Sequence, residues 1–123
     1  MTRQALDLTI NGESHQLMVE PHWSLLHVLR RELGMTGTKE NCLEAECGVC
    51  TVLLDGKTVS SCLTLGVAAS GKAITTVEGL AQNEELLPIQ QAFIDFDASD
   101  QRAAVMSAAG DKAFSSGADI TDL

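Results

Sequence analysis

Residues 42–62 have the sequence CLEAECGVCTVLLDGKTVSSC, which contains all four cysteines of the 123-residue chain. The spacing is C-x4-C-x2-C-x11-C, and C-x4-C-x2-C followed by a more distant cysteine is the plant-type pattern of [2Fe–2S] ligands. Two irons need four thiolates, two for each iron. One loop supplies Cys42, Cys47 and Cys50, and Cys62 supplies the fourth. We therefore predict that these four residues bind one [2Fe–2S] cluster.

The residues between Cys50 and Cys62 indicate how the fourth cysteine returns to the loop. Residues 51–54 and 57–61 are strand-like segments on either side of Asp55-Gly56, which is a hairpin signal. The second strand of this hairpin leads back to Cys62. Because the cluster is anionic, the loop must also direct backbone N–H groups at its sulfurs, and Gly48 permits that close approach.

The main alternative for the cysteines is a structural zinc site. Such sites usually contain two pairs of closely spaced cysteines. Here Cys42 and Cys47 are five residues apart and Cys62 stands alone, so the spacing favours the iron–sulfur cluster. Histidines replace two cysteines in Rieske centres, but four cysteines are sufficient here. We therefore assign surface or packing roles to the three histidines, which are His15, His22 and His27.

The N-terminal part of the chain predicts a hairpin followed by a helix. Residues 4–10 and 14–20 alternate apolar with polar residues around Asn11-Gly12, the strongest short hairpin signal. Ser24 is suited to cap a helix whose leucines recur at helical spacing up to Leu33. Gly34 is expected to end this helix. Its polar side chains are expected to point outward, and these are His27, Arg30 and Arg31.

The order of the expected elements defines the fold class. Residues 73–77 are a candidate strand, and residues 87–96 are a candidate helix with Pro88 in its first turn. The whole order predicts an α+β protein with a β-grasp arrangement, a mixed sheet with one packed helix. This domain covers residues 1–80. A partly helical C-terminal appendage covers residues 81–123.

Composition excludes some classes of function. The net charge is −9 and aromatic residues make up 3% of the chain, which argues against nucleic acid as a partner. No segment has the length of a signal peptide core or of a membrane span. We expect a cytoplasmic protein, where thiols stay reduced and clustered cysteines indicate metal or redox chemistry.

Three segments around the cysteines carry a family resemblance. They are LLHVLRRELGMTGTK at 25–39, CGVCTVLLDG at 47–56 and SCL at 61–63, supported by TVEGL at 76–80 and QQAF at 90–93. Residues 3–97 resemble the iron–sulfur subunit or domain of the molybdenum hydroxylases, the xanthine dehydrogenase and aldehyde oxidase family. The resemblance implies a β-grasp ferredoxin domain. It also implies Cys42, Cys47, Cys50 and Cys62 as ligands, and electron relay between molybdopterin-containing and flavin-containing subunits.

The chain departs from this family in three respects. The family usually has glycine at the position of Asn41 and often at Ala45, and an alanine in a left-handed conformation costs about 1 kcal/mol. The family continues into a domain with a second [2Fe–2S] cluster, but this sequence contains no cysteine after Cys62. Residues 102–123 instead resemble a fragment of the enoyl-CoA hydratase (crotonase) family. A fusion scar, a natural rearrangement or a packing appendage would each account for them.

The residues contain no pattern of acid, base or nucleophile that indicates a substrate site. We therefore predict a one-electron carrier, an oxidoreductase component that serves molybdopterin and flavin subunits or another redox protein. A free-standing, diffusible ferredoxin is the alternative, and a four-cysteine zinc module is the non-redox alternative. The acidic residues of the loop are expected to lower the reduction potential of the cluster; these are Glu40, Glu44 and Glu46.

Overall fold

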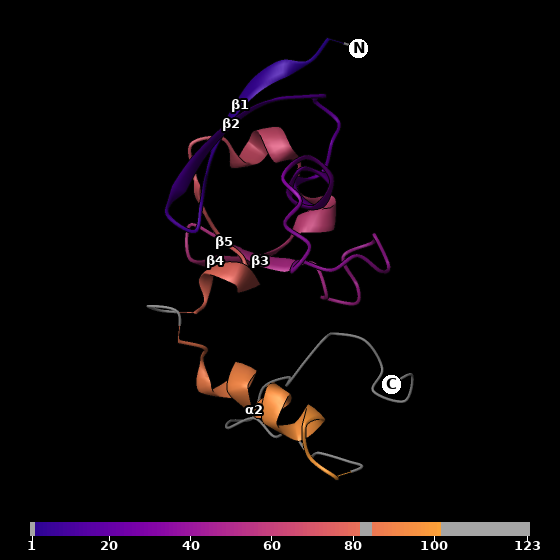
Figure 1. Ribbon diagram of the computed structural model, residues 1–123. Coiled ribbons are helices and arrows are strands. Elements are labelled where there is room, and N and C mark those ends of the chain that lie inside the picture. Colours follow the sequence, from indigo (N-terminus) through magenta and orange to yellow (C-terminus); the bar gives the residue numbers. More distant parts are fainter. Residues whose placement is uncertain (1, 82–84, 102–123) are drawn as a thin grey trace.

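The computed structural model describes residues 2–81 and 85–101. Five strands form one sheet in the order β2-β1-β5-β3-β4 (Figure 1). The strands are β1 (Gln4–Ile10), β2 (Glu13–Val19), β3 (Thr51–Leu54), β4 (Lys57–Ser60) and β5 (Ala73–Thr75). β1 pairs antiparallel with β2 and β3 with β4, while β5 lies parallel to β1 and antiparallel to β3. The sheet is mixed, and the predicted β-grasp arrangement is confirmed.

Both predicted hairpins close through paired left-handed residues. Asn11 and Gly12 have φ values of 52° and 82°, and Asp55 and Gly56 have values of 50° and 80°. Two successive positive φ angles define the turn that matches the twist of antiparallel strands. The second turn also holds β5, the central strand of the sheet. The Ala73 N–H donates to Asp55 Oδ1 over 2.8 Å, and the Asp55 N–H donates to the Ala73 carbonyl over 2.8 Å.

The predicted helix begins and ends where expected but is wound differently. The Ser24 hydroxyl accepts the His27 N–H over 3.0 Å, and Gly34 adopts a φ of 66° after the helix. Only α1 (Leu25–His27) is α-helical, and the chain continues as the π-helical segment η1 (Val28–Glu32). The wider turns shift its later side chains relative to an ideal α-helix.

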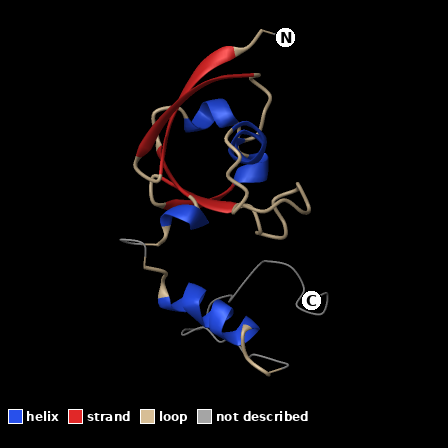
Figure 2. Ribbon diagram, viewed as in Figure 1, coloured by secondary structure: helices blue, strands red, loops and turns tan. Residues whose placement is uncertain are grey.

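The helix lies against one face of the sheet (Figure 2). One continuous core joins the two. Alternate residues of β1 and the apolar side of α1 and η1 supply most of it. The buried residues of this core are Leu6, Leu8, Ile10, Val19, Leu25, Val28, Leu29, Val52, Ala69 and Ile74. Their burial leaves the loop between η1 and β3 at the edge of the domain, where the cysteines lie.

The remaining elements are short. Three 3₁₀ turns follow β4, and they are η2 (Ser61–Leu63), η3 (Gly66–Ala69) and η4 (Val77–Gly79). The predicted C-terminal helix is present as α2 (Pro88–Asp97), and none of its residues is fully buried. None of the helices in the described part of the chain is both long and apolar enough to cross a bilayer. The crotonase-like stretch at 102–123 lies outside the described residues.

Candidate iron–sulfur cluster site

The four cysteines come from one loop and one turn. Cys42, Cys47 and Cys50 lie on the loop between η1 and β3, and Cys50 immediately precedes β3. Cys62 lies in η2, directly after β4. All four are free thiols, with Cys50 buried and the other three half-buried. The structure therefore places Cys42, Cys47 and Cys62 close to the surface and Cys50 beneath it.

Three backbone N–H groups point at the sulfur of Cys42. The amides of Glu44, Glu46 and Cys47 lie 3.4, 3.4 and 3.3 Å from Cys42 Sγ. These contacts, with the Cys47 amide contributing most, lower the pKa of the Cys42 thiol from 9.0 to about 7. Because the thiolate is the form of cysteine that binds metal, the loop stabilises its first cysteine in the form that an iron centre needs.

The loop achieves this curvature with residues in the left-handed conformation. Leu43, Ala45 and Gly48 have φ values of 59°, 58° and 77°. Of the two positions at which the family has glycine, only Ala45 is left-handed, because Asn41 has no positive φ. Leu43 was not anticipated from the sequence. A large side chain with positive φ is an outlier, and no local sequence signal indicates it.

The β3–β4 hairpin returns Cys62 to Cys50. Thr51 and Ser60 are paired across the hairpin. The Cys50 carbonyl accepts the Ser61 N–H over 3.3 Å and the Ser61 hydroxyl over 2.6 Å, and Ser61 is fully buried. These bonds fix the residue before Cys62 against the residue that carries the third thiol, as the sequence had indicated for the hairpin.

The environment of Cys62 shifts the pKa of its thiol in the direction opposite to the shift at Cys42. Burial raises the pKa of the Cys62 thiol, and the nearby thiols of Cys50 and Cys42 act in the same direction, while the Ala45 amide lowers it. The thiols thus lie close enough to influence one another's ionisation. A cationic iron would relieve this mutual repulsion of thiolates.

Arg30 supports the loop from the helix, so the prediction that it points outward is wrong. Its Nη1 donates to the carbonyls of Thr36 and Thr38, over 2.9 Å in each case. The Lys39 N–H then donates to the Val49 carbonyl over 3.3 Å. The π-helical winding of η1 breaks the simple 3.6-residue period from which an outward direction was inferred.

Three acidic side chains lie close to arginine or histidine side chains. Glu40 Oε2 lies 3.9 Å from both Arg30 Nε and Arg31 Nη2, so part of its charge is compensated. His27 Nε2 lies 3.5 Å from Glu32 Oε1, and His22 Nε2 lies 3.5 Å from Glu20 Oε2.

Within residues 2–81 and 85–101, no three side chains of His, Cys, Asp or Glu converge on a position for a single metal ion.

The donor set fits a two-iron cluster. Four thiolates are the ligands that such a cluster takes, two for each iron. The amides around Cys42 provide the hydrogen-bond donors that an anionic cluster requires. The candidate residues to hold the group are Cys42, Cys47, Cys50 and Cys62.

Comparison with known proteins supports this interpretation. Residues 8–81 match the family of the 2Fe-2S iron-sulfur cluster binding domain. The chain is 46% identical over 92 residues to the aldehyde oxidoreductase iron-sulfur-binding subunit PaoA of Escherichia coli (strain K12), covering 75% of this chain and 40% of the relative. It is 38% identical over 95 residues to the nicotinate dehydrogenase small FeS subunit of Eubacterium barkeri, covering 77% of this chain and 60% of that one.

A solved structure shares the fold. Quinoline 2-oxidoreductase from Pseudomonas putida 86 superposes with a TM-score of 0.72 at 43% identity, covering 81% of this chain and 62% of the other. The chain spans 40% and 60% of the length of the two curated relatives named above. The resemblance to the iron–sulfur subunits of the xanthine dehydrogenase and aldehyde oxidase family is confirmed. The match over residues 8–81 shows that the chain belongs to the family of 2Fe-2S iron-sulfur cluster binding domains.

Proposed function

We propose that this protein carries single electrons through one [2Fe–2S] cluster held by Cys42, Cys47, Cys50 and Cys62. The observation that carries the proposal is the group of three backbone amides directed at Cys42 Sγ, beside a hairpin that returns Cys62 to Cys50. When bound, the cluster supplies the ability to accept and release one electron. The protein's own residues hold the ligands, donate hydrogen bonds to the sulfurs and set the charge around them.

The setting of this activity is proposed from the relatives. Their names describe iron-sulfur-binding subunits of an aldehyde oxidoreductase and of a nicotinate dehydrogenase. The protein would then work in the cytoplasm as the small iron–sulfur subunit of a molybdenum hydroxylase-like enzyme, relaying electrons between molybdopterin and flavin subunits. The electron-carrying domain would comprise residues 1–80, and residues 81–123 would form the appendage.

Metal and sulfide analysis of the purified protein tests the cluster. Two irons and two acid-labile sulfides per chain are expected, and zinc without sulfide would refute the proposal. Each Cys→Ser variant at the four positions should lose iron. Ser14→Cys is a matched control, because it adds a thiol on exposed β2 without removing a ligand. It should keep its iron and show one extra alkylatable thiol.

Purification of the native complex tests the partner. Retention of a flavin-containing and a molybdopterin-containing protein with this chain is the expected result. A protein that purifies alone with its cluster intact, and that reduces a soluble acceptor protein, would instead be a diffusible ferredoxin.

A further inference from the structure

Two segments that carry the family resemblance meet in the structure, although 41 residues separate them. The Gly37 N–H, in the TGTK segment, donates to Glu78 Oε2, in the TVEGL segment, over 3.0 Å. We propose that Glu78 is a positioning residue for the cluster loop: by holding Gly37 it fixes the turn at 36–39, and this turn fixes the segment that carries Cys47 and Cys50. The inference rests on the proposed function, because it concerns the ligands of that cluster.

The two segments fit together closely. A Cβ atom added to Gly37 would lie 2.5 Å from Glu78 Oε1 and 2.6 Å from Val77 Cγ1. A side chain at position 37 would therefore make the Glu78 or Val77 side chain move, and glycine lets the carboxylate keep its place against the backbone. On the other side of the same segment, a Cβ at Gly79 would overlap the Asn11 side chain. The η4 turn is thus confined between the first hairpin and the turn at 36–39.

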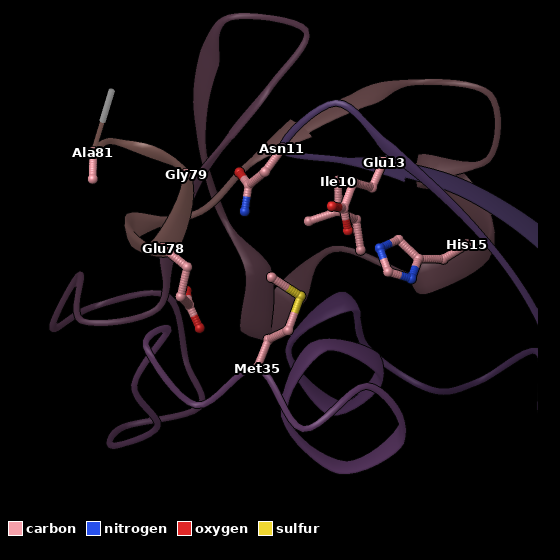
Figure 3. Close-up of a pocket in the computed structure, with 8 residues that line it drawn as sticks. All are labelled: Ile10, Asn11, Glu13, His15, Met35, Glu78, Gly79 and Ala81. Carbon is pink, nitrogen blue, oxygen red and sulfur yellow. The ribbon is translucent and has the colours of Figure 1, made fainter. Parts of the chain in front are cut away.

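The hollow beside η4 shows how Glu78 is presented. It has a volume of about 480 Å³, and Figure 3 shows Glu78 on one side of it, Glu13 on the opposite side and Asn11 between them. Partial burial acts to raise the pKa of Glu78, but the Gly37 amide, its own amide and the Thr76 hydroxyl hold it below its usual value. At neutral pH the Gly37 amide therefore meets a charged acceptor, and such hydrogen bonds are stronger than neutral ones.

The turn at 36–39 transmits this contact to the ligands. Arg30 Nη1 binds the carbonyls of Thr36 and Thr38 from the helix side, so the turn is held from two directions. Its last residue, Lys39, donates its N–H to the Val49 carbonyl over 3.3 Å. Val49 lies between Cys47 and Cys50. Loss of the Glu78 contact would therefore loosen the turn and, through Lys39, the segment that presents two thiolates.

The experiment compares Glu78→Ala, Glu78→Gln and Glu13→Ala in the cluster-loaded full chain. Glu13→Ala is the matched control, because it removes one carboxylate from the same hollow without a hydrogen bond to the turn. Three measurements are made: hydrogen exchange of peptides containing residues 36–39 and 47–50, the electron paramagnetic resonance spectrum of the reduced protein, and the rate of cluster loss.

Glu78→Ala should speed hydrogen exchange in both peptides, change the resonance spectrum and accelerate cluster loss about fivefold, the loss expected for one hydrogen bond. Glu78→Gln retains an acceptor oxygen and should restore most of all three properties. Glu13→Ala should leave them at their wild-type values. Circular dichroism of the variants checks that the fold persists.

The inference is overturned if Glu78→Ala matches the wild type, or if exchange rises at 36–39 but not at 47–50. It is also overturned if Glu78→Gln is as impaired as Glu78→Ala, since the contact would then act through charge alone. A Glu78→Ala chain that does not fold would overturn the positioning role unless Glu78→Gln binds the cluster normally. Failure of the proposed function is separate, because it would appear as a wild-type chain without iron and sulfide.

Discussion

Asn11 and Thr76 bind each other twice, across 65 residues of sequence. Asn11 Nδ2 donates to Thr76 Oγ1 over 2.9 Å, and the Thr76 N–H donates to Asn11 Oδ1 over 3.0 Å. Thr76 is almost completely buried. This pair joins the first hairpin turn to the end of β5, which contains only three residues. A strand that short depends on such contacts to stay in the centre of the sheet.

Asn11→Ala should lower the free energy of unfolding by about 2–3 kcal/mol. The change removes two hydrogen bonds, worth about 1 kcal/mol each, and puts alanine in a left-handed conformation. Asn11→Gly is the matched control, since it loses the same hydrogen bonds but tolerates the backbone. It should be less destabilised, by about 1 kcal/mol. Denaturant unfolding measures the free energy of unfolding of both variants. A glycine variant less stable than the alanine variant would contradict the explanation.

Ala45→Gly should slow the loss of the cluster. The φ of 58° at Ala45 is unfavourable for a residue with a Cβ, and glycine should relieve about 1 kcal/mol of strain. Ala68→Gly is the matched control, because Ala68 is exposed in η3 and does not have a positive φ. It should give no gain. The half-life of the visible absorbance under air reports both variants, and a shorter half-life for Ala45→Gly would disprove this account of the loop.

Replacing Glu44 and Glu46 together by glutamine should raise the reduction potential, by on the order of 20 mV. Reduction adds an electron to an anionic site, so removing nearby negative charge favours the reduced form. Both side chains are exposed, and solvent screening keeps the effect small. Glu13→Gln removes one negative charge outside the loop, so twice its shift gives the effect of the net charge alone. Redox titration measures the potential, and an unchanged or lower value in the double variant would refute the prediction.

Ser61→Ala should accelerate cluster loss about fivefold, because it removes one buried hydrogen bond worth about 1 kcal/mol from the Cys50 carbonyl. Thr64→Val is the matched control. Its hydroxyl binds the Ser60 carbonyl over 2.9 Å in the same turn region but does not contact a cysteine. Because this hydrogen bond does not involve a cysteine, its loss should change the rate of cluster loss less than about twofold. Equal rates of cluster loss for the two variants would show that the Ser61 hydroxyl does not stabilise the cluster.

Local sequence signals were sufficient wherever the deciding contact is local. Asn11-Gly12 and Asp55-Gly56 predicted their turns because the residue types themselves favour positive φ. Ser24 predicted the helix start because its hydroxyl caps an amide three residues away. The cysteine spacing likewise predicted the placement of the candidate ligands, because three thiols on one loop and one after a returning hairpin follow from the order of the elements.

Features that depend on distant segments could not be predicted in this way. The direction of Arg30 follows from the π-helical winding and from the carbonyls that the turn at 36–39 presents. The contact between Gly37 and Glu78 exists only once β5 is inserted beside β1 and carries η4 to the loop.

The amino-acid sequence by itself therefore determined the hairpins, the helix start and the candidate cluster ligands, because each is encoded by residues a few positions apart. Only the tertiary structure decided how the loop is held. The left-handed Leu43, the buried Ser61 and the carboxylate of Glu78 act on or through backbone groups. These groups meet their partners only when the sheet forms, and the periodicity of the sequence does not predict contacts between distant segments.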